Sequence, residues 1–102
     1  MNKEGININR NQNCQITFKN GVTVSILIGA GSYSSSRDME FDYKTLAYEA
    51  NTKSNNAEIA AFSVDKGWIT RELRPDADDG VIGYQSPEDI LSFLNDAANY
   101  KV

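Results

Sequence analysis

Two runs of alternating apolar and polar residues constrain the fold of this chain more than any other feature. The first run extends from Cys14 to Phe18 and the second from Val22 to Ile28, and the pair Asn20-Gly21 lies between them. Alternation with a period of two is typical of a strand with one buried face, and Asn-Gly is typical of a tight turn. The sequence therefore predicts an antiparallel β-hairpin in this region.

The register of this hairpin depends on the length of its loop. A two-residue turn would place Phe18 opposite Thr23, so the apolar faces of the two strands would disagree. A three-residue loop of residues 19–21, with Gly21 as a left-handed bulge residue, pairs Phe18 with Val22 instead. Because this register puts the branched residues on one face, we expect the three-residue loop.

Further strands are expected in the middle of the chain. The nearly continuous apolar run from Ala57 to Val64 is the best candidate for the centre of the sheet. The turn Asp65-Lys66-Gly67 then predicts a second hairpin, with Trp68 to Leu73 as its returning strand. The segment Val81 to Tyr84 is a short apolar piece after an acidic loop.

Two other segments leave alternatives open. Residues 1–13 are polar and rich in asparagine, and they are interpreted as a loose N-terminal arm or an edge strand. Residues 39–50 begin with the alternation of a strand near Phe41, yet their later apolar residues have the spacing of one helical face.

A C-terminal helix has the clearest local signal. Ser86 is a typical N-cap, Pro87 fits the first helical position, and Glu88 and Asp89 place negative charge at the positive end of the helix dipole. Asp89 also completes a capping box with Ser86. An apolar stripe follows over three turns, formed by Ile90, Phe93, Leu94 and Ala97.

These elements predict an α+β fold. The expected architecture is an antiparallel sheet of four to five strands, built from two β-hairpins and the segment near Phe41, with one C-terminal helix packed on one face. A chain of 102 residues has room for one domain, so residues 1–102 are treated as a single domain.

The absence of histidine removes several classes of chemistry. Serine and cysteine nucleophiles activated by an imidazole are excluded. Cys14 is the only cysteine, so neither an internal disulfide nor a Cys/His metal cluster can form, and only oxygen-ligated cations are left open. No particular cofactor or metal is indicated, so none is expected. Cys14 itself is interpreted as a small core side chain.

The charge of the chain bears on its partners and its compartment. Ten basic and fourteen acidic residues give a net charge of −4, and residues 72–102 hold seven of the acids. This balance argues against non-specific binding of nucleic acid. No apolar stretch has the length of a signal peptide or a membrane span, so we expect a cytoplasmic protein with no membrane partner.

Two clusters are candidate binding sites. The Gly/Ser-rich loop after Ile28 carries Tyr33 and Arg37, whose ring and charge, with four serine hydroxyls, would surround a polar ligand. Trp68, Arg71 and Arg74 combine an aromatic platform with guanidinium groups that bind phosphates, bases or a protein partner. The alternative for this second cluster is a core tryptophan beside two solvated arginines.

Acidic residues offer weaker candidates. The run Asp76-x-Asp78-Asp79-Gly80 lacks the spacing of an EF-hand loop, because the fifth position would be Gly80 and the twelfth Pro87. A solvated acidic loop is the default interpretation. Two carboxylates that face each other across a cleft would allow a small hydrolase without histidine.

Several segments resemble a group of small proteins encoded by bacteriophages and prophages. They are Phe18 to Ile26, Ala57 to Ala60, and Asp79 to Tyr84 followed by Ser86 to Asp89, together about half the chain. The resemblance implies a viral accessory protein in the host cytoplasm that acts by occupying a host target.

The function expected from this resemblance and from the missing catalytic groups is non-enzymatic. It is a phage-encoded binding protein that inhibits a host factor in counter-defence. The first alternative is a homo-oligomeric sponge that sequesters a nucleotide-derived immune signal through Tyr33, Arg37, Trp68, Arg71 and Arg74. The second alternative is the carboxylate-based hydrolase.

Overall fold

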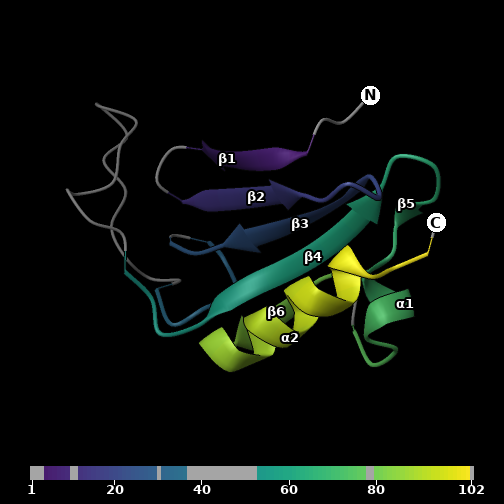
Figure 1. Cartoon of the computed structure of the whole chain (residues 1–102). Helices are drawn as coiled ribbons and strands as arrows, with labels where there is room; N and C mark the ends of the chain where they lie inside the picture. Colours follow the sequence, from purple (N-terminus) through teal and green to yellow (C-terminus); the bar gives the residue numbers. More distant parts are fainter. Residues whose placement is uncertain (1–3, 10–11, 30, 37–52, 78–79, 102) are drawn as a thin grey trace.

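The computed structural model is an α+β fold with one antiparallel sheet and a C-terminal helix packed against it, as predicted. The structure describes residues 4–9, 12–29, 31–36, 53–77 and 80–101. Its elements are β1 (Gly5–Asn9), β2 (Asn13–Thr17), β3 (Val22–Leu27), β4 (Ala57–Ser63), β5 (Gly67–Trp68), α1 (Thr70–Leu73), β6 (Ile82–Gln85) and α2 (Pro87–Ala98). The strands run in the order β1-β2-β3-β4, and β5 and β6 both pair with β4 (Figure 1).

The first hairpin has the predicted register. Cys14 pairs with Ile26 and Ile16 pairs with Val24 between β2 and β3. The amide of Phe18 donates to the carbonyl of Val22 at 2.9 Å, which closes the three-residue loop. Gly21 has φ +84°, a left-handed conformation that glycine adopts without strain.

The edge-strand interpretation of the N-terminal residues is confirmed for residues 5–9. They form β1, which pairs antiparallel with β2 and lies at the edge of the sheet away from α2 (Figure 1). All five residues of β1 are exposed to solvent. β1 therefore pairs with the sheet through its backbone, but its side chains are not part of the hydrophobic core.

The second hairpin is shorter than predicted. β4 is the central strand, as expected, but β5 ends at Trp68, and residues 70–73 form the helical turn α1 instead of a strand. Ile69 and Thr70 are both buried, which breaks the period of two. The hydroxyl of Thr70 donates to the carbonyl of Ala61 at 3.3 Å and accepts from its amide at 3.0 Å. The Thr70 side chain thus hydrogen-bonds the backbone of β4 at Ala61, between the parts of β4 that pair with β5 and β6.

The short apolar piece after the acidic loop is an additional strand, β6. It pairs with β4 through Ile59↔Ile82 and Ala57↔Gln85, with a bulge between these pairs. The sheet therefore has six strands among the described residues, against the four to five predicted. Residues 37–52 lie outside the described residues, so the alternatives for residues 39–50 and the strand near Phe41 remain open.

Helix α2 begins as the sequence predicts. The Ser86 hydroxyl accepts from the Asp89 amide, the Asp89 carboxylate accepts from the Ser86 amide, and both distances are 3.1 Å. Phe93 and Ala97 are fully buried on the face that packs against the sheet. They pack in one hydrophobic core with Val22, Val24, Ile59, Ala61 and Ile69. Burial of Phe93 alone contributes about 1.5–3 kcal/mol to folding.

Asn20 connects the first hairpin to the C-terminal end of α2. Its amide nitrogen lies 2.9 Å from the carbonyl oxygens of both Ala97 and Tyr100, and its amide oxygen accepts from the Val22 amide at 3.0 Å. The last carbonyls of a helix have no hydrogen-bond partner within the helix, so the Asn20 amide supplies the hydrogen bonds that water would otherwise make.

Among the described residues, no helix is long and apolar enough to cross a membrane.

Candidate functional site

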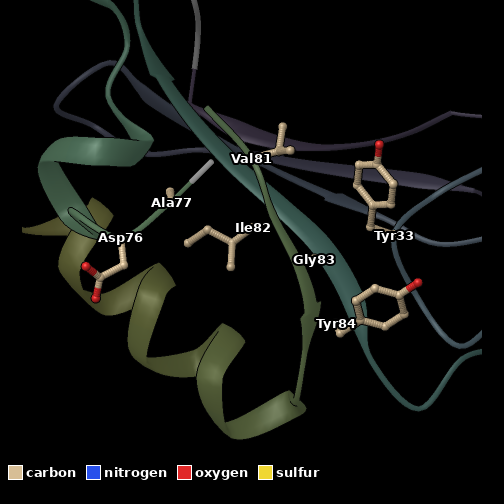
Figure 2. Close-up of a pocket in the computed structure, with 7 residues that line it drawn as sticks. All are labelled: Tyr33, Asp76, Ala77, Val81, Ile82, Gly83 and Tyr84. Atoms are coloured by element: carbon tan, nitrogen blue, oxygen red, sulfur yellow. The ribbon is translucent and has the colours of Figure 1, made fainter. Parts of the chain in front are cut away.

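The candidate site is an open cleft beside β6, with a volume of about 440 Å³. This volume is within the range of roughly 300–1,000 Å³ that is usual for binding pockets. Figure 2 shows the rings of Tyr33 and Tyr84 next to each other at one end of the cleft and Asp76 at the other. The described residues that line it are Tyr33, Asp76, Ala77, Val81, Ile82, Gly83 and Tyr84.

A close backbone contact joins the two sides of the aromatic end. The Tyr84 amide donates to the Tyr33 carbonyl at 2.8 Å. A Cβ atom at Gly83 would lie 2.7 Å from the Cβ of Tyr33, a distance that real Cβ atoms do not tolerate. The two tyrosines can therefore lie side by side only because residue 83 has no side chain.

Tyr84 is held in an unusual backbone conformation. Its φ is +55°, and no other non-glycine residue in the described part of the chain has a positive φ. The left-handed region costs an L-residue with a side chain about 1–2 kcal/mol. Tyr84 is nevertheless 54% exposed, so burial of this residue does not explain the cost. Strain of this kind is concentrated at binding and catalytic sites.

The Gly/Ser-rich loop holds Tyr33 in place. The side chains of Ser32, Ser34 and Ser36 are buried, whereas Tyr33 between them is 46% exposed. The three hydroxyls form a ladder, with oxygen–oxygen distances of 2.7 Å and 3.0 Å. The ladder is tied to Gly29 at both ends, through its carbonyl and its amide.

This ladder changes the role expected for the serines. These three hydroxyls bind one another and the backbone rather than a ligand, and the fourth, Ser35, hydrogen-bonds Ser54 and the Asn55 amide. They therefore connect the loop to itself and to residues 54 and 55. The Tyr33 amide also donates to the Glu58 carboxylate at 3.2 Å, which fixes the loop against β4.

The predicted cluster of Trp68, Arg71 and Arg74 is not brought together. Trp68 packs on Phe62 with ring centroids 5.7 Å apart, on the face of β4 opposite to Ala61 and the core. Trp68 is 68% exposed, so the alternative of a core tryptophan is wrong. Arg74 instead lies on the α2 side, 5.3 Å from the centre of the Phe93 ring.

Both arginines have partners within the fold. Arg71 Nε donates to the Ala77 carbonyl at 3.0 Å and so fixes the loop that forms one wall of the cleft. Arg74 forms an ion pair with Asp96 at 2.8 Å. Arg74 also borders a second hollow of about 240 Å³, which shares Asp76, Ala77 and Ile82 with the cleft.

The predicted site residues therefore have different positions. Tyr33 lines the cleft, Arg74 borders the adjoining hollow, Arg71 supports the wall between them, and Trp68 lies apart. Arg37 is outside the described residues, as are Asp78 and Asp79 of the acidic run. Within the described residues, no three His, Cys, Asp or Glu side chains gather in a group that could hold a metal ion.

Tyr84 and Gly83 are the site residues that sequence reasoning missed. The segment Val81 to Tyr84 has only a short apolar pattern, and a tyrosine gives no local signal for a left-handed conformation. The Gly-Tyr pair was the available hint, because an isolated glycine inside a strand pattern suggests a bulge or a close backbone approach.

Comparisons of the chain with protein-family models, with curated proteins and with solved structures gave no match.

Proposed function

We propose that this protein is a non-enzymatic binding protein whose recognition surface is the cleft beside β6, with Tyr33 and Tyr84 at one end and Asp76 at the other. The observation that carries the proposal is the exposed Tyr84 ring, held beside Tyr33 in a left-handed conformation that costs stability. Exposed tyrosines provide a large contact area at low entropic cost, and they are enriched among the residues that dominate protein–protein affinity. A macromolecular partner fits an open, shallow cleft of this kind.

The partner contributes a basic side chain to the cleft. Asp76 is the charged residue among the described ones that line it, and the faces of tyrosine rings attract cations. The chain has a net charge of −4, so its overall field attracts positively charged surfaces. A lysine or arginine of the partner would therefore lie between the tyrosine rings and the Asp76 carboxylate.

The biological role follows from the resemblance to small phage proteins. We propose that the partner is a host protein in the bacterial cytoplasm and that binding inhibits it, as a counter-defence protein would. This part of the proposal depends on the resemblance and on the missing imidazole and second thiol.

The nucleotide sponge has less support from this geometry. Of the arginines proposed to hold phosphate, Arg74 is paired with Asp96 and Arg71 with a backbone carbonyl. The Asp76 carboxylate would repel a phosphate in the cleft. The hydrolase needs a second carboxylate that faces Asp76, and Asp78 and Asp79 lie outside the described residues, so it stays a prediction.

Affinity capture with matched variants tests the proposal. The tagged protein is incubated with lysate of its natural host, and the recovered proteins are identified and quantified by mass spectrometry. We expect one host protein in a simple ratio to the bait. Tyr84→Asn, which keeps a residue tolerant of the left-handed region, and Tyr33→Ala should each lower its recovery at least about tenfold, as loss of a dominant contact does.

Trp68→Ala is the control, since it removes an aromatic ring that is more exposed than either tyrosine from a different surface. We expect it to capture the partner as the unmodified protein does. Asp76→Asn should weaken capture, and added salt should weaken it less in this variant than in the unmodified protein. Failure to recover any stoichiometric partner, or capture that survives Tyr84→Asn and fails with Trp68→Ala, would contradict the proposed site.

A further inference from the structure

The outer edge of β1 presents backbone groups that point away from the sheet. The Asn9 carbonyl accepts from the Gln12 amide at 3.0 Å, so the peptide groups of Asn9 point toward β2. In an antiparallel strand, successive residues direct their N–H and C=O groups to opposite sides. The N–H and C=O groups of Ile6 and Ile8 therefore point to the open edge, where no strand of the described chain pairs with them.

The same two residues expose apolar side chains. Ile6 is 72% exposed and Ile8 is 64% exposed. Ile6 lies opposite Ile16 and Ile8 lies opposite Cys14 in the β1–β2 register, so the four side chains share one face of the sheet. A further strand paired with β1 would place its own side chains beside Ile6 and Ile8 on this apolar face of the sheet.

β1 lacks the features that usually protect an edge strand. Native edges are blocked by charged side chains, proline, bulges or a covering element. Residues 5–9 read Gly-Ile-Asn-Ile-Asn, with no charge and no proline, and their pairing with β2 is regular. This edge is therefore competent to pair with another strand.

The sequence of β1 is complementary to itself about Asn7. In an antiparallel pair of two β1 strands centred on Asn7, Ile6 of each copy lies opposite Ile8 of the other copy. Both residues of each such pair direct their backbone groups toward the partner, so each pair exchanges two hydrogen bonds. We propose that two copies of this chain form a two-fold symmetric dimer through β1, with one continuous sheet across both.

The distribution of charge favours this edge for self-association. Two copies with a net charge of −4 repel each other, and seven of the fourteen acids lie in residues 72–102. The elements of that region, β6 and α2, lie on the side of the sheet away from β1 (Figure 1). β1 pairing therefore keeps the acidic parts of the two copies apart.

The short strand also sets the strength of the dimer. Five paired residues bury less than a standard interface, so we expect a reversible equilibrium with a Kd of roughly 1 µM to 1 mM. Analytical ultracentrifugation over this range should show a rise from the mass of one chain to twice that mass. Ile6→Lys combined with Ile8→Lys should give a single chain throughout, with an unchanged circular dichroism spectrum as the control for folding.

Cysteine cross-linking tests the register. In the proposed pair, Asn7 faces Asn7 of the other copy at a non-hydrogen-bonded position, where Cα atoms are about 4.5 Å apart and a disulfide can form. In a Cys14→Ser background, Asn7→Cys should yield a disulfide-linked dimer under mild oxidation. Ile8→Cys is the matched control and should not, since the two residues 8 would be more than about 7 Å apart.

Three results would overturn the proposal. They are a single-chain mass across the whole concentration range, a dimer that persists in the double lysine variant, and efficient cross-linking through Ile8→Cys but not Asn7→Cys. None of these measurements involves the cleft, so they are independent of the proposed function.

Discussion

Among single residues, Gly83 and Tyr84 decide the shape of the candidate site. Gly83 lets the Tyr33 backbone approach β6, and Tyr84 presents an exposed ring at the same end of the cleft at the cost of a left-handed backbone. Beyond the hint of a glycine inside a strand pattern, neither property could be predicted from the sequence, because the close approach joins residues about fifty positions apart. Tyr33, in contrast, could be chosen from the sequence, since it lies in a Gly/Ser-rich loop and such loops run over the protein surface and often carry binding residues.

Substitutions at residues 83 and 84 should separate close packing from backbone strain. Gly83→Ala introduces a Cβ atom 2.7 Å from that of Tyr33, and we expect it to lower the free energy of unfolding by about 1–3 kcal/mol. Tyr84→Asn, which tolerates the left-handed region, should change this free energy by less than about 1 kcal/mol.

Tyr84→Val is the matched contrast, because a β-branched residue is disfavoured at positive φ and should cost about 1–2 kcal/mol more than Tyr84→Asn. Urea denaturation of the three variants measures all of these values. Equal stability of the asparagine and valine variants would show that residue 84 is not strained.

Of the individual elements, those with strong local signals were predicted correctly. The first hairpin followed from its alternation and its turn, and α2 followed from its cap and its apolar stripe. The returning strand predicted for residues 68–73 is confirmed only at Trp68, because Ile69 and Thr70 are both buried and residues 70–73 form a helical turn. Ile69 and Leu73 in fact have the i, i+4 spacing of a helical turn, and this turn lets Thr70 bond the edge of β4.

The cap of α2 makes part of the stability dependent on pH. Hydrogen bonds from the Ser86 backbone and hydroxyl lower the pKa of Asp89 below its ordinary value of 3.8. A carboxyl whose pKa is lower in the folded state stabilises the fold above its unfolded pKa, and this stability is lost as the pH falls through the folded pKa. Asp89→Asn should therefore melt below the unmodified protein at pH 7, and the difference should shrink as the pH falls below 3.8 and through the lowered pKa of Asp89.

Ser86→Ala provides the control for this prediction. It removes the hydroxyl of the capping box and should cost about 1 kcal/mol at neutral pH. Thermal melts from pH 7 to about pH 2 follow both variants. A difference between Asp89→Asn and the unmodified protein that stays constant into strong acid would show that the ionised carboxylate does not stabilise the cap.

For the molecule as a whole, the class of fold, the first hairpin and the central strand were predictable, whereas the pairing of β6 was not. Alternation and capping are local, whereas the pairing of β6 with β4 joins residues more than twenty positions apart. The sequence contains no short-range signal for such a pairing. Because β6 carries Gly83 and Tyr84, the cleft itself depends on this one long-range pairing.

The cleft and the β1 edge lie at opposite sides of the same sheet. β6 pairs with one edge of β4, and β1 is separated from β4 by β2 and β3 (Figure 1). A dimer through β1 would therefore leave both clefts open to partners. The two proposals are compatible, and each is tested by its own variants.

Photo-cross-linking from residue 84 tests most directly whether the cleft binds a partner. A benzoylphenylalanine replaces Tyr84 in one sample and the exposed Leu91 of α2 in the other, and both samples are irradiated in lysate of the natural host. We predict a covalent adduct from residue 84 that contains the stoichiometric partner, and none from residue 91. Adducts from residue 91 without any from residue 84 would show that the partner binds elsewhere.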